Sequence, residues 1–296
     1  MSPRFHSSIG QVPVNTAVVS SGRTTRPLSP QTGYRYLDAV LDQPGSVLAF
    51  AHRGGAHHPD VLGAENTLHA FKHAVALGYH YLETDVHATK DGVLVAFHDA
   101  VLDRMTDHSG ALADLTTTDI AQARIGGVYE LPTMASLFEE FPACRFNIDL
   151  KSPDAGEPLA ALIKVMNAWD RVLVGSFSRT RLQEFRKLTG GRVPTSATPI
   201  DGVLYRGLPV PRLATILTGG RVAALQVPHY RGPINVITRG FVRRAHAAGV
   251  HVHVWTVDEA PEMHELLDLG VDGLFTDRTD VLKDVLVERG QWRDHA

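Results

Sequence analysis

The stretch YLETDVHATKDGVLVAFH, residues 81–98, contains two β runs, Tyr81–Val86 and Val93–His98, joined by only six residues. A parallel crossover needs a dozen residues or more, whereas a short connection that ends in Asp91-Gly92 is a hairpin signal. We therefore expect Val93–His98 to fold back antiparallel on Tyr81–Val86, as an addition to the main sheet.

Outward from this hairpin, short β-branched runs alternate with helical patterns, which is typical of βα units around a parallel sheet. The eight runs predict an α/β fold, a (β/α)8 TIM barrel with an antiparallel hairpin after strand 2. The predicted strands are Val47–His52, Tyr81–Val86, Arg145–Lys151, Val172–Phe177, Pro194–Ala197, Ala223–Val227, Val250–Thr256 and Gly273–Thr276. The predicted helices are Asn66–Leu77, Met134–Glu140, Pro158–Trp169, Thr180–Thr189, Phe241–Ala248, Pro261–Leu269 and Val281–Glu288.

Two stretches, residues 99–132 and 201–220, are less regular, and we expect active-site loops or inserted helices there. The first 32 residues are rich in Ser, Thr, Pro and Arg, and they cannot bury enough apolar surface to order themselves alone. We therefore predict an N-terminal tail or strap with a short helix over residues 1–46 and a barrel over residues 47–290.

Composition limits the partners and the compartment. The 296 residues carry a formal net charge of −3, so no basic field attracts nucleic acid, and no partner of that kind is expected. No run approaches the roughly 18 apolar residues of a transmembrane segment. A single cysteine, Cys144, and an N-terminus without a signal-peptide pattern favour a soluble, cytoplasmic protein. The oligomeric state is not determined by the sequence.

Three carboxylates lie at predicted strand ends. Alternate side chains of a strand share one face, so Glu83 and Asp85 point the same way, as do Asp149 and Lys151. The ends of barrel strands meet at the C-terminal face, where active sites lie. Oxygen ligands without sulfur suit a hard divalent cation, Mg²⁺ or Ca²⁺, so the three acids are candidate metal ligands. The alternative is that they are solvated or paired with Arg and Lys.

Two histidines also end predicted strands, His52 in the first strand and His98 in the hairpin strand. Imidazoles near their reference pKa can give or take a proton at neutral pH, and two that flank a substrate can divide the acid and base roles. Most other histidines of the chain, including His57, His58 and His73, are expected at the surface or in the core.

Four further residues are candidates for contacts with a substrate. Arg53 and Lys151 suit an anion, although neutralising the carboxylates would also account for them. Glu65 precedes two natural helix caps, and we give it a supporting role. Trp255 forms either a wall of the site or part of a core layer inside the barrel.

Taken in order along the chain, the motifs resemble those of the glycerophosphodiester phosphodiesterase family over roughly residues 48–287. The motifs are Ala51-His-Arg-Gly54, Glu65-Asn-Thr67, Glu83-Thr-Asp85, Asp91-Gly92, His98-Asp99, Leu102-Asp-Arg104 with Thr106, Asn147-Ile-Asp-Leu-Lys151, Trp255-Thr-Val-Asp258 and Asp272-Gly-Leu-Phe-Thr-Asp277.

This resemblance implies hydrolysis of glycerophosphodiesters to glycerol 3-phosphate and an alcohol, with a divalent metal and a small-molecule substrate. It implies His52 and His98 as the acid and base, metal ligands at the three carboxylates, and Arg53 and Lys151 near the phosphate. One departure is Asp149, where many members have Glu; the shorter side chain puts the metal distance or preference in doubt.

Several alternatives stay open at this stage. Either histidine can be the acid, and either water or the glycerol 2-hydroxyl can attack. A lysophospholipase D on the same barrel would need an apolar groove or a membrane-seeking face, and neither is legible in the sequence. A non-catalytic glycerophosphodiester-binding barrel is a further alternative, because fold does not guarantee activity.

Overall fold

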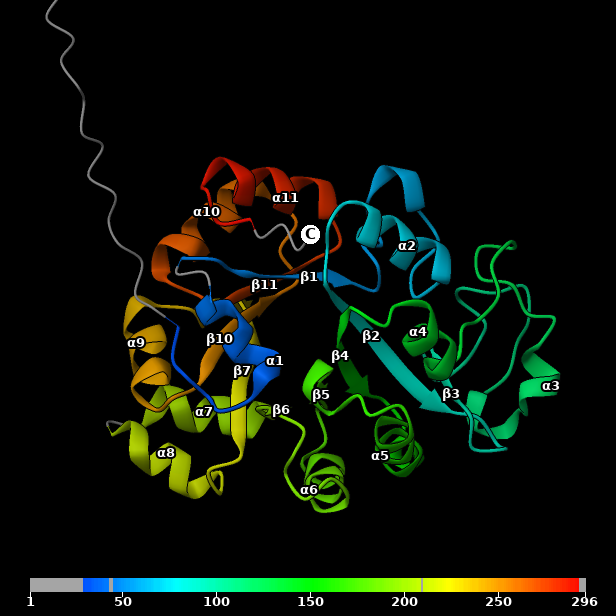
Figure 1. Cartoon of the computed structure of the whole chain (residues 1–296), viewed down its shortest axis with the longest axis horizontal. Coiled ribbons are helices and arrows are strands. Elements are labelled where there is room, and N and C mark those ends of the chain that lie inside the picture. Colours follow the sequence, from blue (N-terminus) through cyan, green and yellow to red (C-terminus); the bar gives the residue numbers. More distant parts are fainter. Residues whose placement is uncertain (1–28, 43–44, 209, 293–296) are drawn as a thin grey trace, which may run out of the picture.

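The computed structural model describes residues 29–42, 45–208 and 210–292; most of the predicted N-terminal tail therefore lies outside the described residues. Eight parallel strands form a closed barrel, as predicted, because β1 pairs with both β2 and β11 (Figure 1). In barrel order the strands are β1 (Leu48–His52), β2 (Tyr81–Ala88), β4 (Arg145–Leu150), β5 (Val172–Gly175), β6 (Thr195–Ser196), β7 (Val222–Pro228), β10 (His251–Trp255) and β11 (Gly273–Thr276).

The predicted hairpin is confirmed. β3 (Leu94–Ala96) runs antiparallel to β2, with Val86 opposite Ala96 and Ala88 opposite Leu94. Gly92 has a φ of +79°, a conformation that glycine adopts without steric cost. The hairpin lies beside the barrel strands (Figure 1). Because β3 runs antiparallel to the last residues of β2, the segment after it returns toward the C-terminal ends of the barrel strands, where His98 lines the pocket.

Two predicted strands, Val172–Phe177 and Pro194–Ala197, are shorter in the structure. After β5 the Ser176 hydroxyl donates to the Leu150 carbonyl, and Ser178 caps the next helix, so the chain has already left the sheet. After β6 Thr198 caps a helix in the same way. In both cases the residue directly after the predicted strand caps a helix, and the paired strand ends one or two residues before the predicted end.

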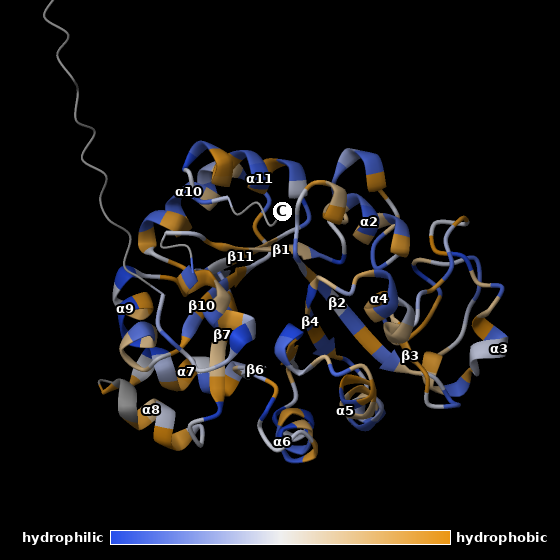
Figure 2. Cartoon of the chain, viewed as in Figure 1, coloured by the Kyte–Doolittle hydropathy of each residue, from blue (hydrophilic) through white to orange (hydrophobic). Residues whose placement is uncertain are grey.

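Helices surround the barrel and alternate with its strands, as predicted. They carry bands of hydrophilic and hydrophobic residues (Figure 2), which is the pattern of a helix with one face on a core. Four of the predicted helices are each followed directly by a glycine of positive φ, which is typical of a helix C-terminus; these glycines are Gly78, Gly190, Gly249 and Gly270. The barrel helices are α2 (Leu68–Ala76), α4 (Met134–Glu140), α5 (Gly156–Val165), α6 (Arg179–Leu188), α7 (Pro199–Gly207), α8 (Pro211–Leu217), α9 (Arg239–Ala247), α10 (Ala260–Leu269) and α11 (Thr279–Glu288).

The two irregular stretches fold differently from each other. Residues 201–220 contain most of α7 and all of α8, which are inserted helices as expected. Residues 99–132 form a long loop with the short helices η3 (Leu112–Asp114) and α3 (Thr117–Ile120). This loop has a small core of its own, in which Phe97 packs with Leu102 and Ile125. The core holds the segment that follows His98 in place.

The N-terminal end of the barrel is closed by α1 (Arg35–Asp38), which crosses the opening in Figure 1. Tyr36 is fully buried there, its ring lies edge-on to Tyr81, and the Tyr81 hydroxyl donates to its carbonyl. Leu37 and Val40 join the same apolar cluster. The described part of the N-terminal region therefore packs on the barrel, whereas the boundary at residue 46 stays a prediction.

None of the helices in the described residues is long and apolar enough to cross a membrane.

Replacing Tyr36 by Ala should lower the free energy of unfolding by about 3–5 kcal/mol, because it leaves a ring-sized cavity at the barrel floor. Urea unfolding measures this loss. Arg35→Ala, on the exposed side of the same helix, is the control and should change the free energy by less than about 0.5 kcal/mol. Equal unfolding midpoints for the two variants would contradict the floor-plug interpretation.

Candidate active site

The candidate site is built at the C-terminal ends of the barrel strands. Strand pairing places His52 beside Glu83, and Asp85 beside Asp149. A pocket of about 960 Å³ opens there. All of the predicted site residues except Glu65 line it, namely His52, Arg53, Glu83, Asp85, His98, Asp149, Lys151 and Trp255. The barrel therefore gathers residues that are as much as 200 positions apart in the chain.

Two cations hold the carboxylates together. The Lys151 ammonium lies 3.0 Å from Asp85 Oδ1 and 2.8 Å from Asp149 Oδ2. Arg53 Nε lies 3.1 Å from Asp85 Oδ2. Although burial opposes the charged form, Lys151 and Arg53 lower the pKa of Asp85. The same carboxylates raise the pKa of Lys151 against the effect of burial. Asp85 is thus a carboxylate between two fixed positive charges.

Glu83 lies in a drier position. Burial raises its pKa to about 7, and the charges of His52 and of the nearby cations only partly offset this. Its Oε2 accepts a hydrogen bond from the Arg53 backbone N–H at 3.1 Å. Near neutral pH this carboxyl group is therefore present in both its protonated and its ionised form.

The candidate metal ligands Glu83, Asp85 and Asp149 all line the pocket. Within the described ranges, two groups of three His, Cys, Asp or Glu residues have ligand atoms that all lie within 4.8 Å, and neither is the predicted trio. Lys151 occupies the space between Asp85 and Asp149 instead. Asp149 Oδ1 is nevertheless buried without a hydrogen-bond partner. An orphaned carboxylate oxygen beside two further acids is a donor set that fits a hard divalent cation.

His52 is oriented by two carboxylates. Its Nδ1 lies 2.8 Å from Asp277 Oδ1, and its Nε2 lies 3.7 Å from Glu83 Oε2. Burial works against the imidazolium, but Glu83 and Asp277 together raise the pKa of His52 above its ordinary value. With Nδ1 bonded to Asp277, Nε2 is the nitrogen left to face a substrate.

His98 has a matching arrangement. Its Nδ1 lies 2.6 Å from Asp99 Oδ1, and Asp99 is held in turn by Arg104. The hydrogen bond from Arg104 is the largest of the effects that lower the pKa of Asp99 to about 2. Arg104 Nη2 also lies 2.7 Å from Glu65 Oε1, and Glu65 lies 3.5 Å from Arg53. Glu65 therefore bridges two arginines from outside the pocket, which fits the supporting role predicted for it.

The β1–α2 loop presents its residues through an unusual backbone. Arg53 and Asn66 both have positive φ, at 51° and 58°. Asn66 is almost fully buried; its side-chain amide donates to Asp85 Oδ2 at 3.3 Å, and its oxygen accepts from Thr84 Oγ1 at 2.8 Å. The helix cap is Thr67, which accepts from the Ala70 N–H. The predicted helix start at Asn66 is therefore wrong, because Asn66 fixes Asp85 instead.

Part of the pocket lining is apolar. Phe177, Val203, Tyr230 and Ile234 line it, and each exposes more than half of its surface. Tyr230 and Ile234 belong to a small hairpin that the sequence did not predict, β8 (Tyr230–Arg231) with β9 (Ile234–Asn235). An apolar groove that was not legible in the sequence is thus present beside the carboxylates.

Trp255 lies in the pocket wall and meets Phe177 edge-on, with ring centroids 6.0 Å apart. His253, two residues earlier on the same strand, is fully buried beside the stacked rings of Phe50 and Phe275 in the barrel interior. Strand β10 therefore contributes His253 to a core layer inside the barrel and Trp255, at its C-terminal end, to the wall of the pocket.

Sequence reasoning assigned no role in the site to Asp277, Asn66, Asp99 or Arg104, and it considered Asn66 only as a helix cap. A signal for Asp277 and Asp99 existed: each carboxylate directly follows the last residue of a predicted strand, close to the strand ends that carry the metal candidates. The signal for Asn66 was hidden by its position at a helix start, where a capping role is the common explanation. The partner of each of these residues is distant in sequence or depends on a loop, so the partner could not be predicted.

Comparison with known proteins adds an independent result. The sequence matches the Glycerophosphoryl diester phosphodiesterase family over residues 52–281. A Mycobacterium tuberculosis protein named "Probable glycerophosphodiester phosphodiesterase 2" is 41% identical over 252 residues, covering 84% of this chain and 94% of that protein. A human protein named "Lysophospholipase D GDPD1" is 26% identical over 276 residues, covering 80% of this chain and 85% of the human one.

The fold has solved counterparts. The crystal structure of a glycerophosphodiester phosphodiesterase from Agrobacterium tumefaciens superimposes with a TM-score of 0.66 at 22% identity, covering 80% of this chain and 99% of the other. At that identity the likeness shows the barrel alone. The family match over most of the barrel and the identity to the mycobacterial protein show that this chain belongs to the glycerophosphoryl diester phosphodiesterase family.

Proposed function

We propose that this enzyme hydrolyses glycerophosphodiesters to glycerol 3-phosphate and an alcohol, with His52 and His98 as the proton-transfer pair. Membership of the family gives the reaction class. The observation that carries the residue assignment is the pair of His–Asp contacts at one pocket, His52 with Asp277 and His98 with Asp99. Each contact engages Nδ1 and leaves Nε2 for proton transfer.

The two histidines come from different elements, His52 from the end of β1 and His98 from the segment after β3. A phosphodiester bound between them would meet one imidazole on the attacking side and the other on the leaving side. One takes the proton of the attacking hydroxyl, and the other gives a proton to the leaving alkoxide oxygen. The environments differ, because His52 is mostly buried and His98 is about one-third exposed at its side chain.

The finer proposal for the metal is Mg²⁺ or Ca²⁺ held by Glu83, Asp85 and Asp149. A divalent cation there would supply positive charge to the phosphoryl oxygens. Arg53 and Lys151 both form ion pairs with Asp85. Once these carboxylates are engaged by a cation, both side chains become available to the substrate anion.

Release of glycerol 3-phosphate from glycerophosphocholine and glycerophosphoethanolamine should depend on Mg²⁺ or Ca²⁺ and stop with a chelator. His52→Ala and His98→Ala should each lower kcat on the order of 10²-fold or more, since each removes a proton-transfer group. His264→Ala, on α10 beside Arg289, is the control and should keep wild-type turnover.

Near-wild-type turnover in both His52→Ala and His98→Ala would disprove the assignment of the pair. Binding of glycerophosphodiesters without any product, in every metal tested, would instead favour a non-catalytic binding barrel.

Metal binding should depend on pH through Glu83, whose pKa of about 7 in the ion-free protein is above its ordinary value. Below pH 7 the ion must displace a proton from this carboxyl group, so affinity should fall about tenfold per pH unit. Calorimetry in buffers of different ionisation enthalpy should find close to one proton released near about pH 6 and almost none near about pH 8. Glu83→Gln should abolish the difference; proton release that does not change with pH would contradict it.

A second substrate class is favoured by one observation, the apolar wall of Phe177, Val203, Tyr230 and Ile234. Glycerol, phosphate and a small headgroup fill only part of a pocket of about 960 Å³. The exposed apolar side chains suit one acyl chain of a lysophospholipid. Cleavage of the same phosphodiester bond would then be lysophospholipase D activity, as the name of the human relative states for that protein.

The double variant Val203→Gln, Ile234→Gln should lower kcat/KM for lysophosphatidylcholine about tenfold or more and leave glycerophosphocholine unchanged, because each lost apolar contact weakens acyl-chain binding. Val287→Gln, at an exposed apolar position on α11, is the matched control. If both substrates are affected equally, the apolar wall does not serve an acyl chain.

A cytoplasmic location is proposed from the sequence, which has one cysteine, and that cysteine is buried.

A further inference from the structure

Three residues whose side chains can bind a metal, His57, Asp258 and Asp277, form a cluster outside the catalytic pocket. His57 belongs to the β1–α2 loop, Asp258 follows β10, and Asp277 follows β11. One ligand atom of each lies within 4.8 Å of the other two. None of the three lines the pocket, so the proposed hydrolysis gives His57 and Asp258 no role.

The spacing of the ligand atoms fits a small tetrahedral ion. His57 Nδ1 lies 3.3 Å from Asp258 Oδ2 and 3.6 Å from Asp277 Oδ2. Zinc bonds to imidazole nitrogen and carboxylate oxygen at about 2.0–2.2 Å, which puts tetrahedral ligands about 3.4 Å apart. Zinc therefore fits between these three atoms with little movement, and it keeps one position open to water.

Both carboxylates are already oriented by their other oxygen. Asp258 Oδ1 accepts hydrogen bonds from the Asp277 N–H at 2.8 Å and from Thr276 Oγ1 at 3.0 Å. Asp277 Oδ1 contacts His52 Nδ1 at 2.8 Å. In each aspartate Oδ1 is therefore engaged by these contacts, and Oδ2 is the oxygen that faces His57. Such outer contacts are the ones that fix ligand orientation at metal sites.

The imidazole is fixed from the main chain and open to solvent. The His57 N–H donates to the Asp277 carbonyl at 3.0 Å, which holds the loop against β11. Its side chain is 63% exposed, whereas that of Asp277 is 11% exposed. An ion can therefore enter past His57. A proton on His57 Nδ1 can form a good hydrogen bond to only one of the two facing oxygens, Asp258 Oδ2 or Asp277 Oδ2, whereas a dication can bind both oxygens.

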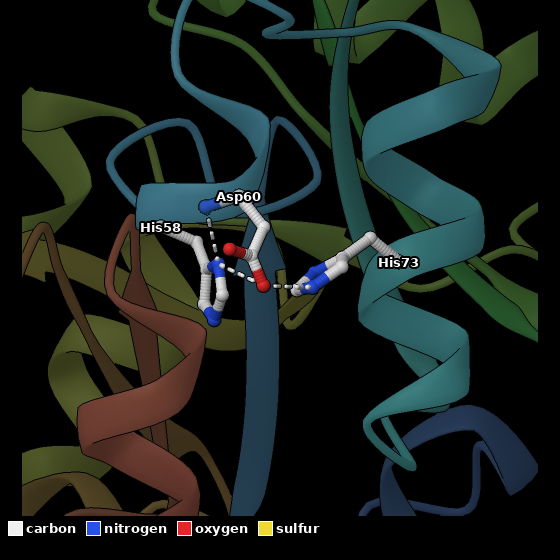
Figure 3. Close-up of side chains that lie close together, drawn as sticks. All are labelled: His58, Asp60 and His73. Atoms are coloured by element: carbon white, nitrogen blue, oxygen red, sulfur yellow. Dashed lines mark hydrogen bonds and ion pairs between the residues drawn. The ribbon is translucent and has the colours of Figure 1, made fainter.

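A second His and Asp cluster, His58, Asp60 and His73, has a different arrangement (Figure 3). Here His58 Nδ1 accepts a hydrogen bond from the Asp60 N–H at 3.1 Å as the cap of the short helix η2 (Pro59–Val61). The nitrogen that faces the Asp60 carboxylate therefore has its lone pair engaged. This cluster serves as an internal control of similar composition.

We propose that His57, Asp258 and Asp277 form a zinc site that inhibits the enzyme by withdrawing Asp277 from His52. A zinc ion on Asp277 Oδ2 draws electron density from the carboxylate and weakens the hydrogen bond that Oδ1 accepts from His52 Nδ1, which orients His52. The choice of Zn²⁺ over Mg²⁺ or Ca²⁺ follows from the imidazole ligand. The inhibitory effect rests on the proposed role of His52, whereas zinc binding does not.

Zinc binding is tested first, without substrate, by competition with a fluorescent zinc chelator in excess Mg²⁺. The wild-type protein should take up one tight equivalent of Zn²⁺, and His57→Gln should lose at least about tenfold in affinity for it. His73→Gln, from the cluster in Figure 3, should keep wild-type affinity. Equal zinc affinity in the wild type and His57→Gln would overturn the site, whether or not the enzyme is active.

Inhibition is tested next with glycerophosphocholine and Mg²⁺. Without zinc, His57→Gln should keep wild-type kcat, because His57 lies outside the pocket. Zinc should lower the activity of the wild type and of His73→Gln over the concentration range in which it binds, and His57→Gln should need at least about tenfold more zinc. Tight zinc binding without inhibition would overturn the link from Asp277 to His52.

Discussion

The pairing of β1 with both β2 and β11 closes the barrel, and the rest of the site depends on it. This pairing puts His52 opposite Glu83 on one side and places Ala51 opposite Thr276, one residue before Asp277, on the other. The imidazole therefore lies between two carboxylates that come from opposite ends of the chain. The orientation of His52 and the rise in its pKa both depend on this closure, because a sheet left open at β1 would lose one of the two carboxylates.

Charge compensation is the second constraint on the pocket. Asp85 is nearly fully buried and would be costly as an ion without Arg53 and Lys151. Among the described residues, the Glu83 carboxyl group has no arginine or lysine charge as close as those beside Asp85, and burial therefore raises its pKa. The carboxylates and cations of the site are thus balanced against one another, and the carboxyl group of Glu83, with a pKa of about 7, is partly protonated near neutral pH. This balance explains why the two cations contact carboxylates rather than stand free for a substrate.

The two ends of the barrel serve different purposes. At the floor, α1 buries Tyr36 and seals the interior with apolar and aromatic side chains. At the mouth, loops and short elements leave Phe177, Val203 and Ile234 largely exposed beside a strongly polar centre. Such exposure is tolerated at a binding surface, whereas the floor gains stability from burial. The proposed zinc cluster lies at the mouth end, on the segments that follow β1, β10 and β11.

The sequence determined the barrel, its hairpin and eight of the residues that line the pocket, because strand periodicity and strand-end position are local properties. Asp91-Gly92 in a short connection sufficed for the hairpin, and the i, i+2 spacing placed Glu83 and Asp85 on one face. Tertiary structure alone decided the partners: Asp277 for His52, Asn66 for Asp85, and His57 for two aspartates. Each of these contacts joins loops or strands that the barrel brings together across sequence separations that no local pattern encodes.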